Sequence, residues 1–184
     1  VGFSRESFKK TYNLHVKYGI KRQTNNFPVS IVGYNSINLD TSLDENVYPN
    51  LNYNERYVYI SQLLISRRFS DKFSLQLSPS VIKHNFLTTQ AETDYNYVLN
   101  TGSRLKISKR SSFNIDYSYH LNRLKNSSEK NVLSLGIDME TGGHVFQLLF
   151  SNTQASDEAG VLTGAEGDWL KGDVYFGFNI LRVF

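Results

Sequence analysis

Asp116 and His120 are the residues of this chain whose types come closest to an acid–base pair. They lie four positions apart in an extended segment, so their side chains share one face of a strand. At ~3.3 Å per residue the two positions are about 13 Å apart, which is too far for a hydrogen bond. We also find no serine, histidine and acid at a spacing that would activate a nucleophile. The sequence therefore predicts no catalytic residues and a protein that is not an enzyme.

Histidines are also the residues that would bind a metal ion or a haem. The chain has four of them, His15, His84, His120 and His144, and no cysteine. None has a second histidine or a carboxylate at the spacing of a known metal site. His144 follows a glycine turn, where bonding to the backbone is the simpler explanation. We expect no metal ligands and no cofactor.

Ionisable residues alternate with apolar ones along several segments, so the two kinds fall on opposite faces of extended chain. Unlike charges pair across neighbouring strands, and we expect Arg104 and Lys106 to face Asp116, with Asp138 and Glu140 one strand further on. The predicted interior set consists of His15, Lys17, Lys21, Arg104, Lys106, Asp116, His120, Asp138 and Glu140. Two interpretations stay open: a charge network that plugs a small barrel, and a selective conduit lined by these charges.

Ten segments carry the period-2 pattern and the bounding turn residues of β-strands. They are Val1–Ser4, Asn13–Arg22, Val29–Asn38, Arg56–Arg68, Ser74–Lys83, Tyr95–Ile107, Phe113–Leu121, Val132–Glu140, His144–Ser151 and Gly172–Phe184. Most are long enough to cross hydrocarbon at a tilt, which takes about 9–11 residues. Two of them, Val29–Asn38 and Arg56–Arg68, have aliphatic residues on both faces, and the pattern does not orient them.

The connections between these segments alternate between short and long, which is typical of outer-membrane β-barrels. The short connections are Thr24–Pro28, Ser70–Phe73, Ser108–Ser112 and Thr141–Gly143. The long connections are Arg5–Tyr12, Leu39–Glu55, His84–Asp94, Asn122–Asn131 and Asn152–Lys171. The last segment ends on a phenylalanine, and we interpret Phe176, Phe178, Ile180 and Phe184 as a terminal assembly signal.

Composition narrows the class of protein further. A length of 184 residues predicts one domain. Scattered lysines and arginines give a net charge of +3 without a basic stripe, so we expect no nucleic acid partner. No apolar run approaches the ~18 residues of a membrane helix. Aromatic residues gather near both ends of the segments, as in the girdles of a membrane barrel, whereas a soluble lipocalin-like barrel would not need them there.

Several motifs are shared with a known family. They are Arg5-Glu-Ser-Phe-Lys-Lys-Thr-Tyr12, Gln62-Leu-Leu-Ile-Ser-Arg-Arg-Phe69, Leu75-Gln-Leu-Ser-Pro79, Glu140-Thr-Gly-Gly-His-Val-Phe-Gln147, and Gly167-Asp-Trp169 followed by Phe176-Gly-Phe-Asn179. The chain resembles, over nearly its whole length, an uncharacterised family of outer-membrane β-barrels found in Bacteroidota. The resemblance implies about two further strands after a signal peptide, and so roughly twelve in the full protein. It implies no catalytic or binding residues.

The connection Asn152–Lys171 is the best candidate for an interaction surface, because loops on a rigid scaffold often carry function. We expect its acids to be solvated or to meet a partner, and Trp169 to act there or as an interfacial anchor. The candidate residues are Asp157, Glu158, Glu166, Asp168 and Trp169.

The sequence thus predicts an all-β fold: a single domain over residues 1–184, an antiparallel up-and-down transmembrane β-barrel in the outer membrane of a Gram-negative bacterium. We expect a scaffold or partner-binding subunit of an envelope complex with a largely plugged lumen. Its partners would be the lipid bilayer, the outer-membrane assembly machinery and a protein of that complex. A narrow transporter or pore is the alternative hypothesis, and a membrane-embedded hydrolase the third.

Overall fold

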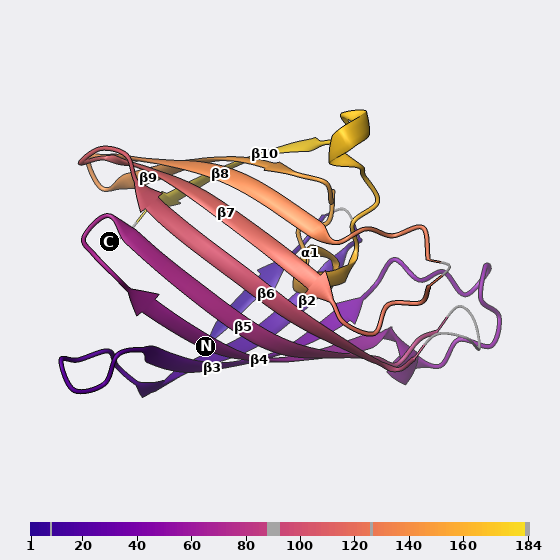
Figure 1. Cartoon of the computed structure of the whole chain (residues 1–184). Helices are drawn as coiled ribbons and strands as arrows, with labels where there is room; N and C mark the ends of the chain where they lie inside the picture. Colours follow the sequence, from indigo (N-terminus) through magenta and orange to yellow (C-terminus); the bar gives the residue numbers. More distant parts are fainter. Residues whose placement is uncertain (8, 88–92, 126, 183–184) are drawn as a thin grey trace.

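A single antiparallel sheet makes up most of the computed structural model (Figure 1). The structure describes residues 1–7, 9–87, 93–125 and 127–182. Ten strands follow one another in sequence order across the sheet. They are β1 (Gly2–Arg5), β2 (Thr11–Lys21), β3 (Ser30–Asp40), β4 (Tyr57–Arg68), β5 (Phe73–His84), β6 (Tyr95–Lys106), β7 (Ser111–His120), β8 (Val132–Thr141), β9 (His144–Ser151) and β10 (Tyr175–Arg182). The ten predicted strands are all present, with ends shifted by a few residues.

The connections gather at two ends of the sheet, which we call the short-turn end and the long-loop end (Figure 1). At the short-turn end, β8 and β9 are joined by Gly142 and Gly143, both with positive φ, as a tight hairpin turn requires. The predicted alternation of short and long connections was wrong at one place, because connection 22–29 at the short-turn end is longer than connection 6–10 at the long-loop end. There β2 ends early, after a β-bulge between Gly19 and Lys21.

The curved sheet has an apolar convex face and a polar concave face. On the convex face, large hydrophobic side chains such as Leu14, Ile37 and Phe176 are exposed. On the concave face, small polar side chains such as Ser78 and Ser118 are buried. Side chains alternate along a strand, and residues paired across neighbouring strands share a face. The pairing therefore assigns the residues of every strand to one of the two faces. This is the arrangement of a barrel wall that meets lipid outside and polar groups inside.

The register orients the two strands that the pattern left open. Ser36 and Asn38 of β3 lie opposite Ile60 and Val58 of β4, and all four share the concave face. Ile60 is 1% exposed although the concave face is mostly polar. Aliphatic residues occur on both faces of β4 because a helix packs against its inner side.

That helix is α1 (Glu158–Thr163), from the connection between β9 and β10. Figure 1 shows it on the concave side of the sheet, where it contacts β4, β6, β7 and β8. Two one-turn helices, η1 (Tyr53–Arg56) and η2 (Trp169–Lys171), lie in the connections to β4 and β10. Among the residues placed by the structure, no helix combines the length and the apolar character needed to cross a bilayer.

The sheet curls without closing on itself. In the described part of the chain, β1 pairs only with β2 and β10 pairs only with β9. The short β1 covers only the stretch Tyr12–His15 of β2.

Candidate functional site in the lumen

A charge network occupies the concave face near the short-turn end. Arg104 of β6 lies 3.2 Å from Glu140 and 3.9 Å from Asp138, measured from Nη2 to the nearest carboxylate oxygen. Its Nε donates a hydrogen bond of 2.9 Å to Ser112 Oγ. Gln147 of β9 donates to the other oxygen of Asp138 at 3.0 Å. Four neighbouring strands are thereby joined across the interior.

The partners of Arg104 differ from the expected ones. In the register Gly102 lies opposite Asp116, and Arg104 lies opposite Asn114. The long arginine side chain reaches over β7 to the acids of β8. Asp116 instead accepts a hydrogen bond of 2.7 Å from Asn100 Nδ2.

Neutral polar side chains fill the middle of the concave face. The same Asn100 amide nitrogen also donates to Ser118 Oγ at 2.9 Å. Ser80 Oγ donates to Gln62 Oε1 at 3.3 Å. These groups satisfy one another, which buried polar groups require.

The predicted histidines have separate amide partners. His120 Nε2 lies 3.1 Å from Asn96 Oδ1, and the ring is 8% exposed. His15 Nδ1 lies 2.8 Å from Asn13 Oδ1, and its ring stacks on Tyr34 at 5.4 Å between centroids. Among the described residues, no hydrogen bond joins Asp116 to His120, and each bonds to a different asparagine.

Of the three predicted lysines, two keep to the concave register and one leaves it. Lys17 lies opposite Tyr34 and Lys106 opposite Ser112. The bulge places Lys21 opposite Ile31, out of phase with Lys17, and its Nζ lies 5.5 Å from the centroid of the Phe27 ring. Lys21 therefore does not belong to the interior set, because one inserted residue reverses the faces that follow it.

The helix α1 seals the concave face toward the long-loop end. Ala159 and Leu162 are each 6% exposed and pack against Ile60, Ile82 and Val98. We call this helix with its apolar contacts the plug. Burying leucine-sized side chains of this kind stabilises a contact by about 1.5–3 kcal/mol each.

Two acids lie at the start of the plug, and one of them fixes it to the barrel wall. Asp157 caps α1 by accepting a hydrogen bond of 3.1 Å from Gly160 N. Glu158 accepts a hydrogen bond of 2.6 Å from Ser36 Oγ on β3. Burial raises the pKa of Glu158 to about 7, and the amide of Asn13 opposes this shift. The expectation of solvated acids was thus wrong for Glu158, which faces the lumen.

The helix itself was missed, although the sequence contains its signal. Asp157 precedes the short apolar run Ala159–Leu162, and an aspartate in that position is a frequent N-cap. The run covers little more than one turn, which is too short to show helical periodicity.

The rest of the predicted loop set is dispersed. Asp168 caps η2 by accepting from Leu170 N at 3.0 Å, and Trp169 Nε1 donates to the carbonyl of Leu133 at 3.0 Å. Glu166 is exposed. Of the terminal residues, Phe176 and Phe178 contact Phe150 and Phe146 of β9 on the convex face, with ring centroids 5.4 Å and 6.2 Å apart. Ile180 is exposed on the same face, and Phe184 lies outside the described residues.

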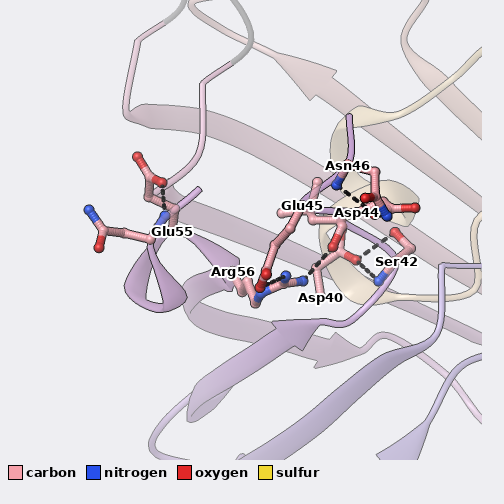
Figure 2. A network of polar contacts seen from close by, with 9 residues as sticks. Asp40, Ser42, Asp44, Glu45, Asn46, Glu55 and Arg56 are labelled. Carbon is pink, nitrogen blue, oxygen red and sulfur yellow. Dashed lines mark hydrogen bonds and ion pairs between the residues drawn. The ribbon is translucent and has the colours of Figure 1, made fainter. Parts of the chain in front are cut away.

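A second polar cluster organises connection 41–56 at the long-loop end (Figure 2). Arg56 donates to the carbonyl of Leu43 at 2.6 Å and pairs with Glu45 at 3.3 Å. Asp40 accepts from the backbone and side chain of Ser42, at 2.8 Å and 2.6 Å. A cavity of about 500 Å³ lies between these groups and Lys10. Sequence analysis did not single out this cluster.

Nothing in this geometry assembles a metal centre. Within residues 1–7, 9–87, 93–125 and 127–182, no three histidine, aspartate or glutamate side chains come close enough to share an ion.

An all-antiparallel sheet of sequential strands, apolar outside and polar inside, defines a membrane β-barrel. The chain belongs to the family described as "Membrane bound beta barrel domain (DUF5777)", whose family model matches residues 1–184. The comparisons with curated proteins and with solved structures gave no match.

Proposed function

We propose that this chain forms an outer-membrane β-barrel of a Gram-negative bacterium of the Bacteroidota, and that it is a scaffold or partner-binding subunit of an envelope complex. The barrel is not an enzyme, and its lumen is largely filled. The plug carries this proposal, because a helix bound to four strands occupies the space that a solute would need. The Arg104 network supports it by joining four strands near the other end.

We further propose that additional strands close the barrel, to roughly twelve in all. The support is that, in the described part of the chain, no further strand pairs with the outer edge of β1 or of β10. Within hydrocarbon, unpaired backbone groups cost several kcal/mol each, so a membrane barrel needs partners on both edges.

The partner surface in this proposal lies on the long connections. In connection 41–56 the Arg56 side chain is 12% exposed and bonds to Leu43 and Glu45, and Glu45 is 76% exposed. A pre-ordered loop with exposed acids binds a partner with less loss of entropy than a loose one. A photo-crosslinking residue at position 45 should capture the partner in cells, whereas one at position 71 in a short turn should not.

Conductance tests whether the lumen is filled. The full-length protein in planar bilayers should give no steady channels. Leu162→Asp places a charge against Ile60, Ile82 and Val98, which should expel the plug and open a channel. Leu170→Asp is the matched control, because Leu170 lies in the same connection and is 97% exposed. The Leu170→Asp variant should give no steady channels.

A narrow pore for a small solute is the second candidate, and the neutral polar lining of Asn100 and Ser118 favours it. Steady channels in the unmodified protein whose ion selectivity changes in Arg104→Met would establish the pore and refute a filled lumen. Circular dichroism on each variant separates loss of the channel from loss of the fold.

A further inference from the structure

The convex face of β3–β6 is hollowed by a groove of about 450 Å³. We call it the outer groove, and its lining includes Gly33, Ser61, Leu63, Pro79 and Val81. The register places these five on the side that faces lipid. The groove therefore opens on the lipid side of the sheet, and Gln62, Ser80 and Val98 of the lumen-facing register also border it.

Local sequence explains the hollow. Gly33 has no side chain, and a Cβ there would lie 2.3 Å from Cζ of Tyr18, so the tyrosine ring lies flat over the backbone. Pro79 stands inside β5 without an amide hydrogen, and the pairing of β4 with β5 is interrupted between Gln62 and Ile65. Small side chains and an interrupted ladder leave space between larger neighbours.

Polar side chains in the outer groove satisfy one another. Ser61 Oγ donates to Asn35 Oδ1 at 2.8 Å, and Asn35 Nδ2 donates to the hydroxyl of Tyr18 at 3.3 Å. Unpaired polar groups would be costly in hydrocarbon, and this series of hydrogen bonds pairs the three side chains with one another. The rest of the lining is mainly aliphatic and aromatic, with Leu63, Val81 and Leu99 among it.

A cation lies beyond one end of the outer groove. Lys83 follows Val81 on the same face of β5, roughly 7 Å further toward the long-loop end at ~3.3 Å per residue. Its neighbours across the two ladders are Tyr59 and Tyr95. Lys83 Nζ lies 5.7 Å from the centroid of the Tyr95 ring. Tyrosines at strand ends mark the interface between hydrocarbon and headgroups.

We propose that the outer groove and Lys83 together bind one anionic lipid that carries an acyl chain and a phosphate in its headgroup. An acyl chain fills the groove, and the headgroup phosphate pairs with the Lys83 ammonium. Apolar volume on a lipid-facing surface matches a hydrocarbon chain, and the Lys83 cation at its interfacial end matches a negative headgroup. The inference rests on the membrane placement that the family gives, and it is independent of the scaffold role.

Native mass spectrometry of the full-length protein, released from detergent micelles, tests this site. Phosphatidylglycerol should stay bound more than phosphatidylcholine. Lys83→Gln should lower retention of phosphatidylglycerol about fivefold, which is the effect of one basic residue near an anionic lipid, and should abolish the preference. Lys72→Gln, in the short turn at the opposite end, should change neither.

Filling the groove tests the acyl chain separately. Val81→Phe should reduce retention of both lipids. Leu75→Phe is the matched control, since Leu75 lies on the same strand and face, and the two residues are 37% and 36% exposed. Equal retention of the two lipids by the unmodified protein, or unchanged retention in Lys83→Gln, overturns the proposal. A dimer that Val81→Phe dissociates would also overturn it, by making a second copy the occupant. The scaffold role could fail in conductance or crosslinking and leave these results unchanged.

Discussion

Glu158 is the acid whose protonation links the plug to pH. Burial raises the pKa of Glu158 to about 7 in the docked plug, whereas the released plug has an ordinary glutamate with a lower pKa. Between these two pKa values, the docked plug keeps a proton that the released plug has lost. Docking is then strongest in acid, and weakens as the pH rises from about 5 to about 8. The sign follows because the state that holds more protons is favoured at low pH.

Glu158→Gln should remove this pH dependence, since an amide oxygen still accepts from Ser36 and does not titrate. Trp169, the only tryptophan, lies in the same connection and reports on it by fluorescence. Glu166→Gln, an exposed acid of that connection, is the control and should titrate like the unmodified protein. An unchanged titration in Glu158→Gln would assign the effect to another group.

At the same scale, sequence analysis found which residues share a face but not which ones bond. The alternation placed Arg104, Asp116 and Asp138 together on the concave face. It chose Asp116 on the neighbouring strand as the partner of Arg104, and this was wrong, because the order of strands does not state how far an arginine side chain reaches. The prediction for Lys21 was wrong for a different reason, because a β-bulge leaves no clear mark in the alternation of polar and apolar residues.

Among the elements, strands were predictable and the plug was not. Polar and apolar residues alternate along a strand over about ten positions, so the sequence pattern of a strand is long enough to recognise. β4 lacked a clear pattern because the inner side of the sheet is apolar where α1 covers it, as at Ile60. That reason lies in a segment nearly a hundred residues away, which no local pattern contains.

Connection 41–56 supplies a prediction about an element. Arg56→Met keeps an unbranched side chain but removes its bonds to Leu43 and Glu45, so proteases should cut the loop faster. The protease should be one that does not cut at arginine, because the substitution itself would otherwise remove a cleavage site. Arg68→Met, which removes an arginine that is 61% exposed in its pair with Asp71, should have no such effect. Equal rates in the two variants would show that Arg56 does not order the loop.

For the whole molecule, the two ends of the sheet predict two sides of a membrane. The chain has no cysteine, so single cysteines can be introduced cleanly. Glu45→Cys in a long loop and Asp71→Cys in a short turn replace exposed acids at opposite ends, 76% and 93% exposed. A membrane-impermeant maleimide should label the first on intact cells, and the second only after permeabilisation. Labelling of both on intact cells would contradict the proposed orientation.

The order of strands also sets an order of events. Every strand pairs with its neighbours in sequence, so the sheet can grow hairpin by hairpin, with one connection to close at each step. The plug breaks this rule, because α1 precedes β10 but contacts β4. It can settle only after the strands from β4 to β8 have curled around its place. Docking of the plug is therefore a late step, which needs the curved wall from β4 to β8 already in place.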